Sequence, residues 1–198
     1  MAVATGHFSR GMEPSVAKAL ETVAEALGVT RTVTLPESAE ARAAAYIITA
    51  SEGSQLHLSR LQTRLQDFDP ATRDRFVAGA LIPSSWYIQA QRFRRWYRNQ
   101  VREVFKTVDL ILAPTTPCTA PLIEQTTIDL EGEQVLLRPH LGFYTQPLSF
   151  IGLPVLSVPL SQPGEMPAGV QLIARPYDEL TLFKAAVALE RAGITQPA

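Results

Sequence analysis

Apolar residues recur every three or four positions in several stretches of the chain, a spacing typical of helices with one buried face. The predicted helices span residues 14–27, 38–65, 70–79, 86–106 and 178–192. Pro14 suits the first turn of its helix, Gly28 and Gly193 suit helix ends, and Asp178 is placed to cap the last helix. Gly53 is a possible interruption of the second helix.

Short runs rich in β-branched or other apolar residues separate these helices and predict strands. The predicted strands span residues 1–5, 29–35, 108–114, 155–161 and 168–176. Segment 115–141 lacks such a pattern and is predicted to be rich in loops. Because neither an internal repeat nor a low-complexity linker interrupts the chain, we expect a single α/β domain over residues 1–198.

Charge and composition narrow the function classes. The 198 residues are 46% hydrophobic and carry a formal net charge of -1, so the overall field does not favour nucleic acid or an anionic membrane. One cysteine cannot form an internal disulfide, no signal pattern opens the chain, and no uncharged apolar run approaches the roughly 20 residues of a membrane span. We expect a cytoplasmic protein that binds neither nucleic acid nor membrane.

The residues that usually carry catalysis or metals are scattered. His7, His57 and His140 lie far apart and none belongs to an HExxH motif or a CxxC pair. Cys118 lies in a Pro-Cys-Thr segment that lacks the nearby cation or helix start that activates a thiolate. We therefore expect no metal and no cofactor, and ordinary structural roles for these four side chains.

Adjacent serines can act as relay and nucleophile in one class of hydrolase, where small residues flank them. Ser84 and Ser85 are flanked by Pro83 and Trp86 instead, and a predicted helix follows at once. The pair is better interpreted as a helix cap and a first-turn serine. No GxSxG elbow is present, and the lysines lie on the polar faces of predicted helices: Lys18, Lys106 and Lys184.

Positive charge is concentrated in one part of the chain. Residues 60–106 hold ten basic and four acidic side chains, a balance of +6, which leaves -7 for the remainder. A solvated helix face is the simplest explanation. The run "RFRRWYR" also mixes arginine with aromatic residues, as an anion-binding, nucleic-acid or acidic-partner surface would.

Three segments carry a resemblance to a known family. They are "DLILAPTTPCTAP", "TQPLSFIGLPVLSVPL" and "MPAGVQLIARPYDELTLFKAAVALE". In order and spacing they resemble the C-terminal part of the amidase-signature family. Upstream, "GHFSRG", "ITASEGSQLHLSR" and "ATRDRFVAGALIPSSWYIQAQRFRRWYR" look most like the carboxybiuret (biuret) hydrolase subunits, and less closely like the A-type component of the amidotransferases. The resemblance implies the C-terminal part of the amidase-signature fold, with a mixed β-sheet flanked by helices.

The resemblance also implies where catalysis resides. Family members carry a catalytic lysine and a glycine/serine-rich stretch, holding a bridging and a nucleophilic serine, in their N-terminal half. The 198 residues contain no Gly-Gly-Ser-Ser-Gly-like run, so that half is taken to be absent and no catalytic residue is assigned. Because amide hydrolysis needs an activated hydroxyl, a base and oxyanion donors, we expect this chain alone to be inactive.

The resemblance implies a substrate pocket to which seven residues contribute: Arg75, Thr115, Thr116, Gln146, Phe150, Gly152 and Leu153. Arg75 matches by position an arginine that is implied to bind the substrate carboxylate in the related amidotransferases, and a buried guanidinium would grip a carboxylate with two hydrogen bonds. Thr115 and Thr116 end an apolar strand between prolines, which suits either a hydroxyl-lined cavity or a purely structural turn.

The expected function is therefore that of part of an amidohydrolase that cleaves a C–N bond of a small linear amide once joined to the other half. Its expected partners are that substrate and either a second copy or a small accessory subunit. The alternative is a non-catalytic binding or assembly module: either a fragment of an A-type amidotransferase subunit, or an anion- or partner-binding protein that uses the basic helix 86–106.

Overall fold

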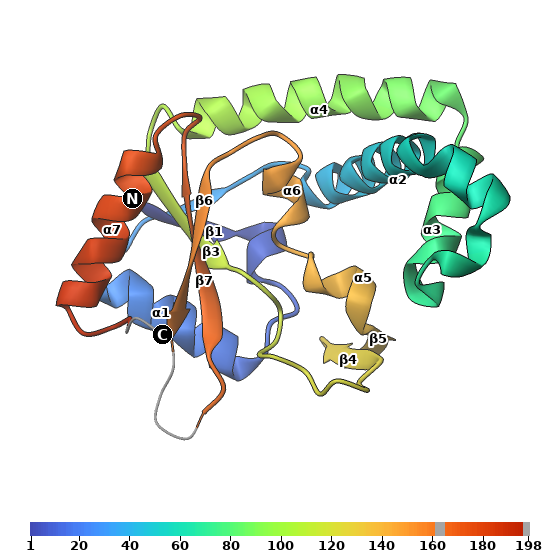
Figure 1. Ribbon diagram of the computed structural model, residues 1–198. Helices are drawn as coiled ribbons and strands as arrows, with labels where there is room; N and C mark the ends of the chain where they lie inside the picture. Colours follow the sequence, from blue (N-terminus) through green and yellow to red (C-terminus); the bar gives the residue numbers. More distant parts are fainter. Residues whose placement is uncertain (161–164, 196–198) are drawn as a thin grey trace.

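A five-stranded sheet forms the centre of the computed structural model, which describes residues 1–160 and 165–195 (Figure 1). In spatial order the strands are β2 (Thr32–Thr34), β1 (Ala2–Thr5), β3 (Leu110–Pro114), β7 (Ala168–Ala174) and β6 (Val155–Leu160). β1 is parallel to β2 and β3, whereas β7 is antiparallel to β3 and β6. The sheet is therefore mixed, as expected. Ser161, the predicted end of β6, lies outside the described residues.

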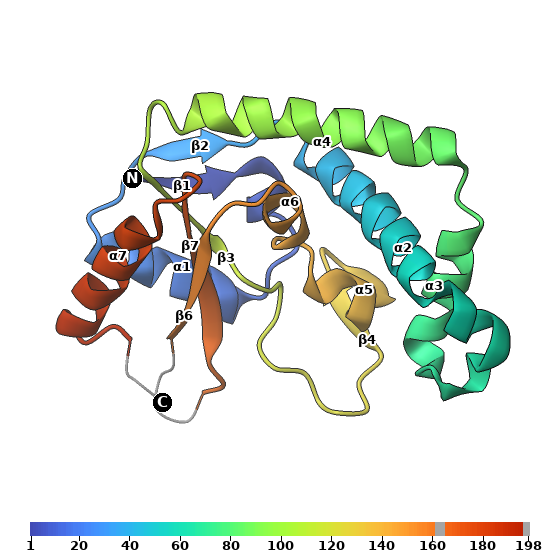
Figure 2. The same cartoon turned by 45° about the horizontal axis from the view of Figure 1, so that its top comes forward.

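Helices cover both faces of this sheet because its central strands are apolar on both sides. Along β3, Ile111 and Ala113 join a core with the helices α2 (Ser38–Thr63) and α4 (Ser84–Val104). Leu110 and Leu112 point the other way, into a core with α1 (Pro14–Ala26) and α7 (Glu179–Arg191). Figure 2 shows α4 lying along β2 and α2, while α1 and α7 lie on the far side of the sheet.

Small residues let α3 (Pro70–Ala80) pack closely against α2. A Cβ atom built on Gly79 would lie 2.2 Å from the carbonyl oxygen of Ala50, and one on Gly53 would lie 2.9 Å from a ring carbon of Phe76. The α2 helix continues through Gly53, so the suspected interruption is absent. Close packing holds α3 at the end of α2 farthest from the sheet (Figure 2).

Segment 115–141 contains more regular structure than predicted. A hairpin forms between β4 (Thr127–Leu130) and β5 (Glu133–Leu136), followed by the short helix α5 (Leu137–Leu141). Its two turn residues, Glu131 and Gly132, have φ values of 57° and 86°, as this hairpin turn requires. The prediction of a loop was wrong here because the strands are short and only Ile128 is fully buried in them.

Two cap predictions fail in detail. Asp178 is the N-cap residue of α7, as predicted, but its carboxylate accepts a hydrogen bond from the Thr181 hydroxyl at 2.8 Å and pairs with Arg175 at 3.3 Å, rather than accepting from a helix N–H. Ser84 and Ser85 both lie in the first turn of α4, where Pro83 is the N-cap. Neither serine caps the helix. The remaining short elements are η1 (Gly6–Ser9), η2 (Leu65–Asp67) and α6 (Gln146–Ser149).

Candidate functional site

A cleft of about 760 Å³ opens between α2, α3, α5 and α6. Its volume lies within the range of roughly 300–1,000 Å³ that small-molecule sites occupy. It is lined by Ala39, Arg42, Ala43, Tyr46, Ile47, Ala71, Thr72, Arg75, Arg138, Pro139, His140 and Gln146. Of the seven predicted site residues, the structure brings Arg75 and Gln146 together here. We refer to this site as the arginine cleft.

Arg75 projects from α3 and is held at two points. Its guanidinium donates a hydrogen bond to the Thr49 hydroxyl at 2.6 Å and lies 4.6 Å from the ring centroid of Tyr46. Both partners belong to α2, so the close packing of α3 on α2 sets the position of this charge. The side chain is exposed at the wall of the cleft, whereas a buried guanidinium was expected.

Arg42 is the half-buried arginine of the cleft and is not among the residues that the sequence predicted. One of its terminal nitrogens donates to the Pro139 carbonyl at 2.6 Å, and its guanidinium lies 5.3 Å from the Phe143 ring centroid. Its Nε is buried without a hydrogen-bond partner. Burial lowers the pKa of this guanidinium, which still carries its charge at neutral pH. An unpaired buried donor costs about 1–3 kcal/mol, so this arginine is held in place at an energetic cost.

The remaining polar groups make the cleft positive. Arg138 contributes a third guanidinium, which is 3.5 Å from the Asp69 carboxylate, and His140 is held through Nδ1 to the Leu136 carbonyl at 2.8 Å. No aspartate or glutamate is among the residues that line the cleft. Gln146 adds a side chain that can both donate and accept. Chemically, the arrangement suits a small carboxylate with an adjoining amide.

Two of the other predicted residues lie where β3 ends. The Thr115 hydroxyl is 2.8 Å from the Ser157 hydroxyl, and the Thr115 N–H donates to the Gly169 carbonyl at 2.9 Å. The Thr116 hydroxyl donates to the Cys118 carbonyl at 2.7 Å. Neither threonine is among the residues lining the arginine cleft. Their predicted contact with substrate stays a prediction.

The three remaining predicted residues follow α6. Phe150 is buried and stacks on Tyr97 at a centroid distance of 5.8 Å, and burial raises the pKa of Tyr97 to about 12. Gly152 adopts a φ of 76°, which favours glycine, in the turn that leads to β6. Leu153 packs against the same core as Phe150. Phe150 and Leu153 thus belong to the core after α6, and the direct role of all three residues in binding stays a prediction.

Gln171 is a buried polar residue that connects the end of β3 with the segment before α6. It lies on β7, fully buried, and its Nε2 donates to the carbonyls of Pro114 at 2.8 Å and Tyr144 at 3.4 Å. It therefore ties the end of β3 to the segment that precedes α6 and Gln146. A glutamine between apolar residues in "GVQLI" is the signal that could have marked it.

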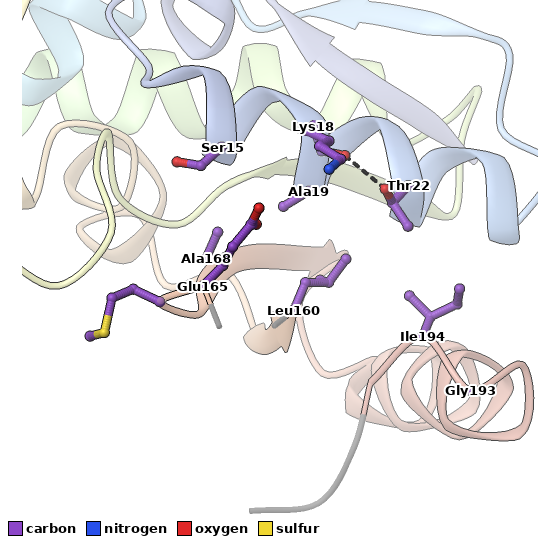
Figure 3. A pocket seen from close by; sticks show the side chains of 10 residues that line it. Ser15, Lys18, Ala19, Thr22, Leu160, Glu165, Ala168, Gly193 and Ile194 are labelled. Atoms are coloured by element: carbon purple, nitrogen blue, oxygen red, sulfur yellow. Dashed lines mark hydrogen bonds between the residues drawn. The ribbon is translucent and has the colours of Figure 1, made fainter. Parts of the chain in front are cut away.

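A second cavity lies between α1, the start of β7 and the turn after α7 (Figure 3). It encloses about 190 Å³, below the usual range for a small-molecule site. Figure 3 shows its walls, where Ala19, Ala168, Leu160 and Ile194 supply apolar surface and the Glu165 side chain points toward α1. The larger size and the convergent charges favour the arginine cleft as the functional site.

His7 has a structural contact, and Cys118 is buried. The His7 Nε2 lies 2.9 Å from the Phe143 carbonyl oxygen, and burial raises the pKa of the Cys118 thiol. Within residues 1–160 and 165–195, no three His, Cys, Asp or Glu side chains gather as metal ligands. In the same residues, no helix combines the length and the apolar character needed to cross a membrane.

Comparison with known proteins decides the family. The Amidase family profile matches residues 1–183, which is most of the chain. The chain belongs to the amidase family. It is 44% identical to AtzE, the 1-carboxybiuret hydrolase subunit of Pseudomonas sp. (strain ADP), a match that covers 96% of this chain and 42% of that relative. It is also 38% identical to the A-type component of the Glutamyl-tRNA(Gln) amidotransferase of Sulfurimonas denitrificans, over 70% of this chain and 31% of the relative.

Solved structures show the same fold. One, described as an unexpected vestigial protein complex that reveals the evolutionary origins of an s-triazine catabolic enzyme, superimposes with a TM-score of 0.95 at 42% identity. The superposition covers 98% of this chain and 43% of the chain in that structure. The A-type component of the Glutamyl-tRNA(Gln) amidotransferase of Thermotoga maritima gives a TM-score of 0.74 at 26% identity, over 96% of this chain and 41% of that chain. The chain thus spans about two fifths of the length of AtzE and of these two solved chains.

Proposed function

We propose that this amidase chain forms the part of an amidohydrolase that binds the carboxylate end of a small linear amide. The arginine cleft carries the proposal: Arg42 and Arg75 face one cavity with Gln146, and no acidic side chain lines it. A guanidinium binds a carboxylate through charge-assisted hydrogen bonds, and the glutamine amide can pair with an amide group of the same molecule. The similarity to AtzE, a 1-carboxybiuret hydrolase subunit, supports a carboxylated substrate.

The proposal divides binding from bond cleavage. Hydrolysis of an amide needs a nucleophile, a base that activates it and donors for the oxyanion. The 198 residues contain no glycine/serine-rich run that could present a serine pair. We therefore propose that the chain alone binds but does not hydrolyse, and that the lysine and the two serines come from the remaining length of an enzyme of this family.

An ammonia-release assay tests the division. The purified chain is incubated with biuret, 1-carboxybiuret and acetamide, and ammonia is measured against a sample without protein. We expect no release above that background for any of the three. Turnover by the 198-residue chain, lost on heat denaturation, would show that it carries its own nucleophile and would overturn this part of the proposal.

The assembly state is a separate question. The relatives AtzE and the amidotransferase components are subunits, so we propose that the chain works beside a second copy or a small accessory protein. Size-exclusion chromatography with light scattering measures this directly for the chain alone. A dimer mass supports self-association, and a monomer at all concentrations contradicts it.

A further inference from the structure

The outward face of α4 carries a row of arginines that the cleft does not use. Ala90, Tyr97 and Val101 are buried on the inner face of this helix. The outer face presents Ile88, Arg92, Arg95, Trp96, Arg98 and Arg102, all exposed. We call these six residues the α4 stripe; Figure 2 shows the helix along the outside of the molecule.

The four stripe arginines are not neutralised. Among the described residues, none of Arg92, Arg95, Arg98 and Arg102 forms an ion pair or a side-chain hydrogen bond. Lys106, just beyond the helix, contrasts with them, because it pairs with Glu103 at 2.7 Å. Like charges at this spacing repel one another, so the stripe raises the energy of the free helix slightly.

The apolar members of the stripe argue against a purely solvated face. Ile88 and Trp96 expose 52% and 41% of their surface among the arginines. Arginine and tryptophan are enriched at protein interfaces, where each can contribute strongly to binding, whereas lysine is depleted. A helix that only needs solubility would more often carry lysine and glutamate in alternation.

We propose that the α4 stripe binds an acidic polypeptide segment that presents both carboxylates and apolar side chains. From Arg92 to Arg102 the helix rises about 15 Å, or roughly three turns. A partner helix of similar length, with carboxylates three or four residues apart, can pair with several of these arginines while its apolar side chains cover Ile88 and Trp96.

A nucleic acid fits this surface less well. Outside residues 60–106 the chain has a net charge of -7, which opposes a long polyanion, and a phosphate backbone offers no apolar group for Ile88. The proposal is independent of the cleft, because no stripe residue lines it. Loss of one activity would therefore leave the other intact.

A peptide titration tests the proposal. The full chain is titrated against a fluorescein-labelled peptide of about 20 residues built from glutamate, leucine and alanine, with fluorescence anisotropy as the signal. The charge-reversal variant R95E/R102E changes the stripe. The matched control K184E/R191E changes the same number of charges at the same seven-residue spacing on the exposed surface of α7. Thermal melts verify that both variants fold.

We expect the wild-type chain to bind the peptide, with an affinity that falls at least about tenfold between 50 and 300 mM salt. R95E/R102E should weaken binding by at least about tenfold, while the control variant stays within about twofold. Equal losses of peptide affinity in both variants would show that binding depends only on the net charge of the chain, and would overturn the proposal. A lack of peptide binding would also overturn it. So would binding of a single-stranded oligonucleotide that is tighter than peptide binding and depends equally on the stripe. Self-association of the chain that R95E/R102E abolishes would overturn it as well.

Discussion

The two arginine sets of this amidase chain differ in how they are held, although the side chains are the same. In the cleft, Arg42 is half-buried and bonded to the Pro139 carbonyl, and Arg75 is fixed by Thr49 and Tyr46. On the α4 stripe, Arg95 and its neighbours extend into solvent without partners among the described residues. The cleft charges therefore have set positions, and the stripe charges do not.

Rigidity sets what each surface can bind. A small anion makes few contacts, so it gains measurable affinity only where the guanidinium groups are already oriented. Each free arginine on the stripe loses rotamer freedom, worth about 0.5–1.5 kcal/mol, when it is immobilised. Only a partner that makes many contacts at once offsets that loss, which favours a polypeptide on the stripe and a small carboxylate in the cleft.

Disrupting the scaffold of the cleft should have the largest effect. In Gly79→Ala the new methyl group would meet the Ala50 carbonyl, so α3 must move away from α2 and carry Arg75 with it. We expect the free energy of unfolding to fall by about 1–3 kcal/mol and anion binding in the cleft to be lost. Peptide binding by the stripe should stay within about twofold of wild type.

The control is Ala78→Gly, an exposed site on the same helix that should cost only about 0.5–1 kcal/mol. Urea denaturation measures both variants. Equal stabilities of Gly79→Ala and wild type would show that close packing of α3 on α2 does not position Arg75.

Removing one cleft charge should have a smaller and more specific effect. Arg42→Met keeps much of the apolar stem but removes the guanidinium and its buried, unpaired Nε. We expect carboxylate affinity in the cleft to fall about tenfold, because a hydrogen bond to a charged group contributes about 1.5–3 kcal/mol. Isothermal titration calorimetry compares it with Arg92→Met, which removes a stripe arginine and should leave cleft binding unchanged. Equal losses would contradict the separation of the two sets.

The smallest effect concerns pH. Burial lowers the pKa of His7 from its ordinary value of 6.5, and the nearby charges of Arg42 and Arg10 act in the same direction, against the hydrogen bond to Phe143. Because the unfolded chain then binds a proton more readily than the folded chain, this contribution to stability is present above pH 6.5 and is lost as pH falls toward the folded pKa. Stability should therefore decline as the pH falls below about 6.5.

Two carboxyl groups also have lowered pKa values. The pKa of Asp69 is lowered chiefly by the hydrogen bond from the Ala71 N–H, and that of Glu131 chiefly by its bond from Arg10, so both act at more acidic pH. His7→Asn should flatten the decline, measured by urea denaturation at each pH. An unchanged slope in His7→Asn would assign the pH dependence to another group.

The main helices and the five strands of the central sheet were predictable because their signals are local, whereas the mixed sheet was implied by the family resemblance. Apolar spacing and the positions of Pro14, Pro70 and Gly28 mark the helices, and continuous apolar runs mark strands buried on both faces. The hairpin over 127–136 escaped prediction because its strands are four residues long and mostly exposed. Gly132, in the two-residue turn, was its one local signal.

The site was only partly predictable, for a different reason. The resemblance to the amidase-signature family marked Arg75 and Gln146, which the structure places in one cleft. Arg42 reaches the same cleft from an alanine-rich stretch of α2, and what distinguishes it is the half-buried environment created by Pro139 and Phe143. Those residues lie nearly a hundred positions away in sequence, so no local pattern reveals the contact.

The most direct test of the central claim compares two small amides that differ in one charge. Malonamate carries a carboxylate beside its amide, and malonamide is its uncharged counterpart. In an NMR titration of the ¹⁵N-labelled chain, malonamate at millimolar concentration should shift the backbone amide signals of Thr49, Arg75 and Gln146, and malonamide should not. Equal shifts by both compounds, or malonamate shifts confined to residues outside the cleft, would contradict the claim that this cleft recognises a carboxylate.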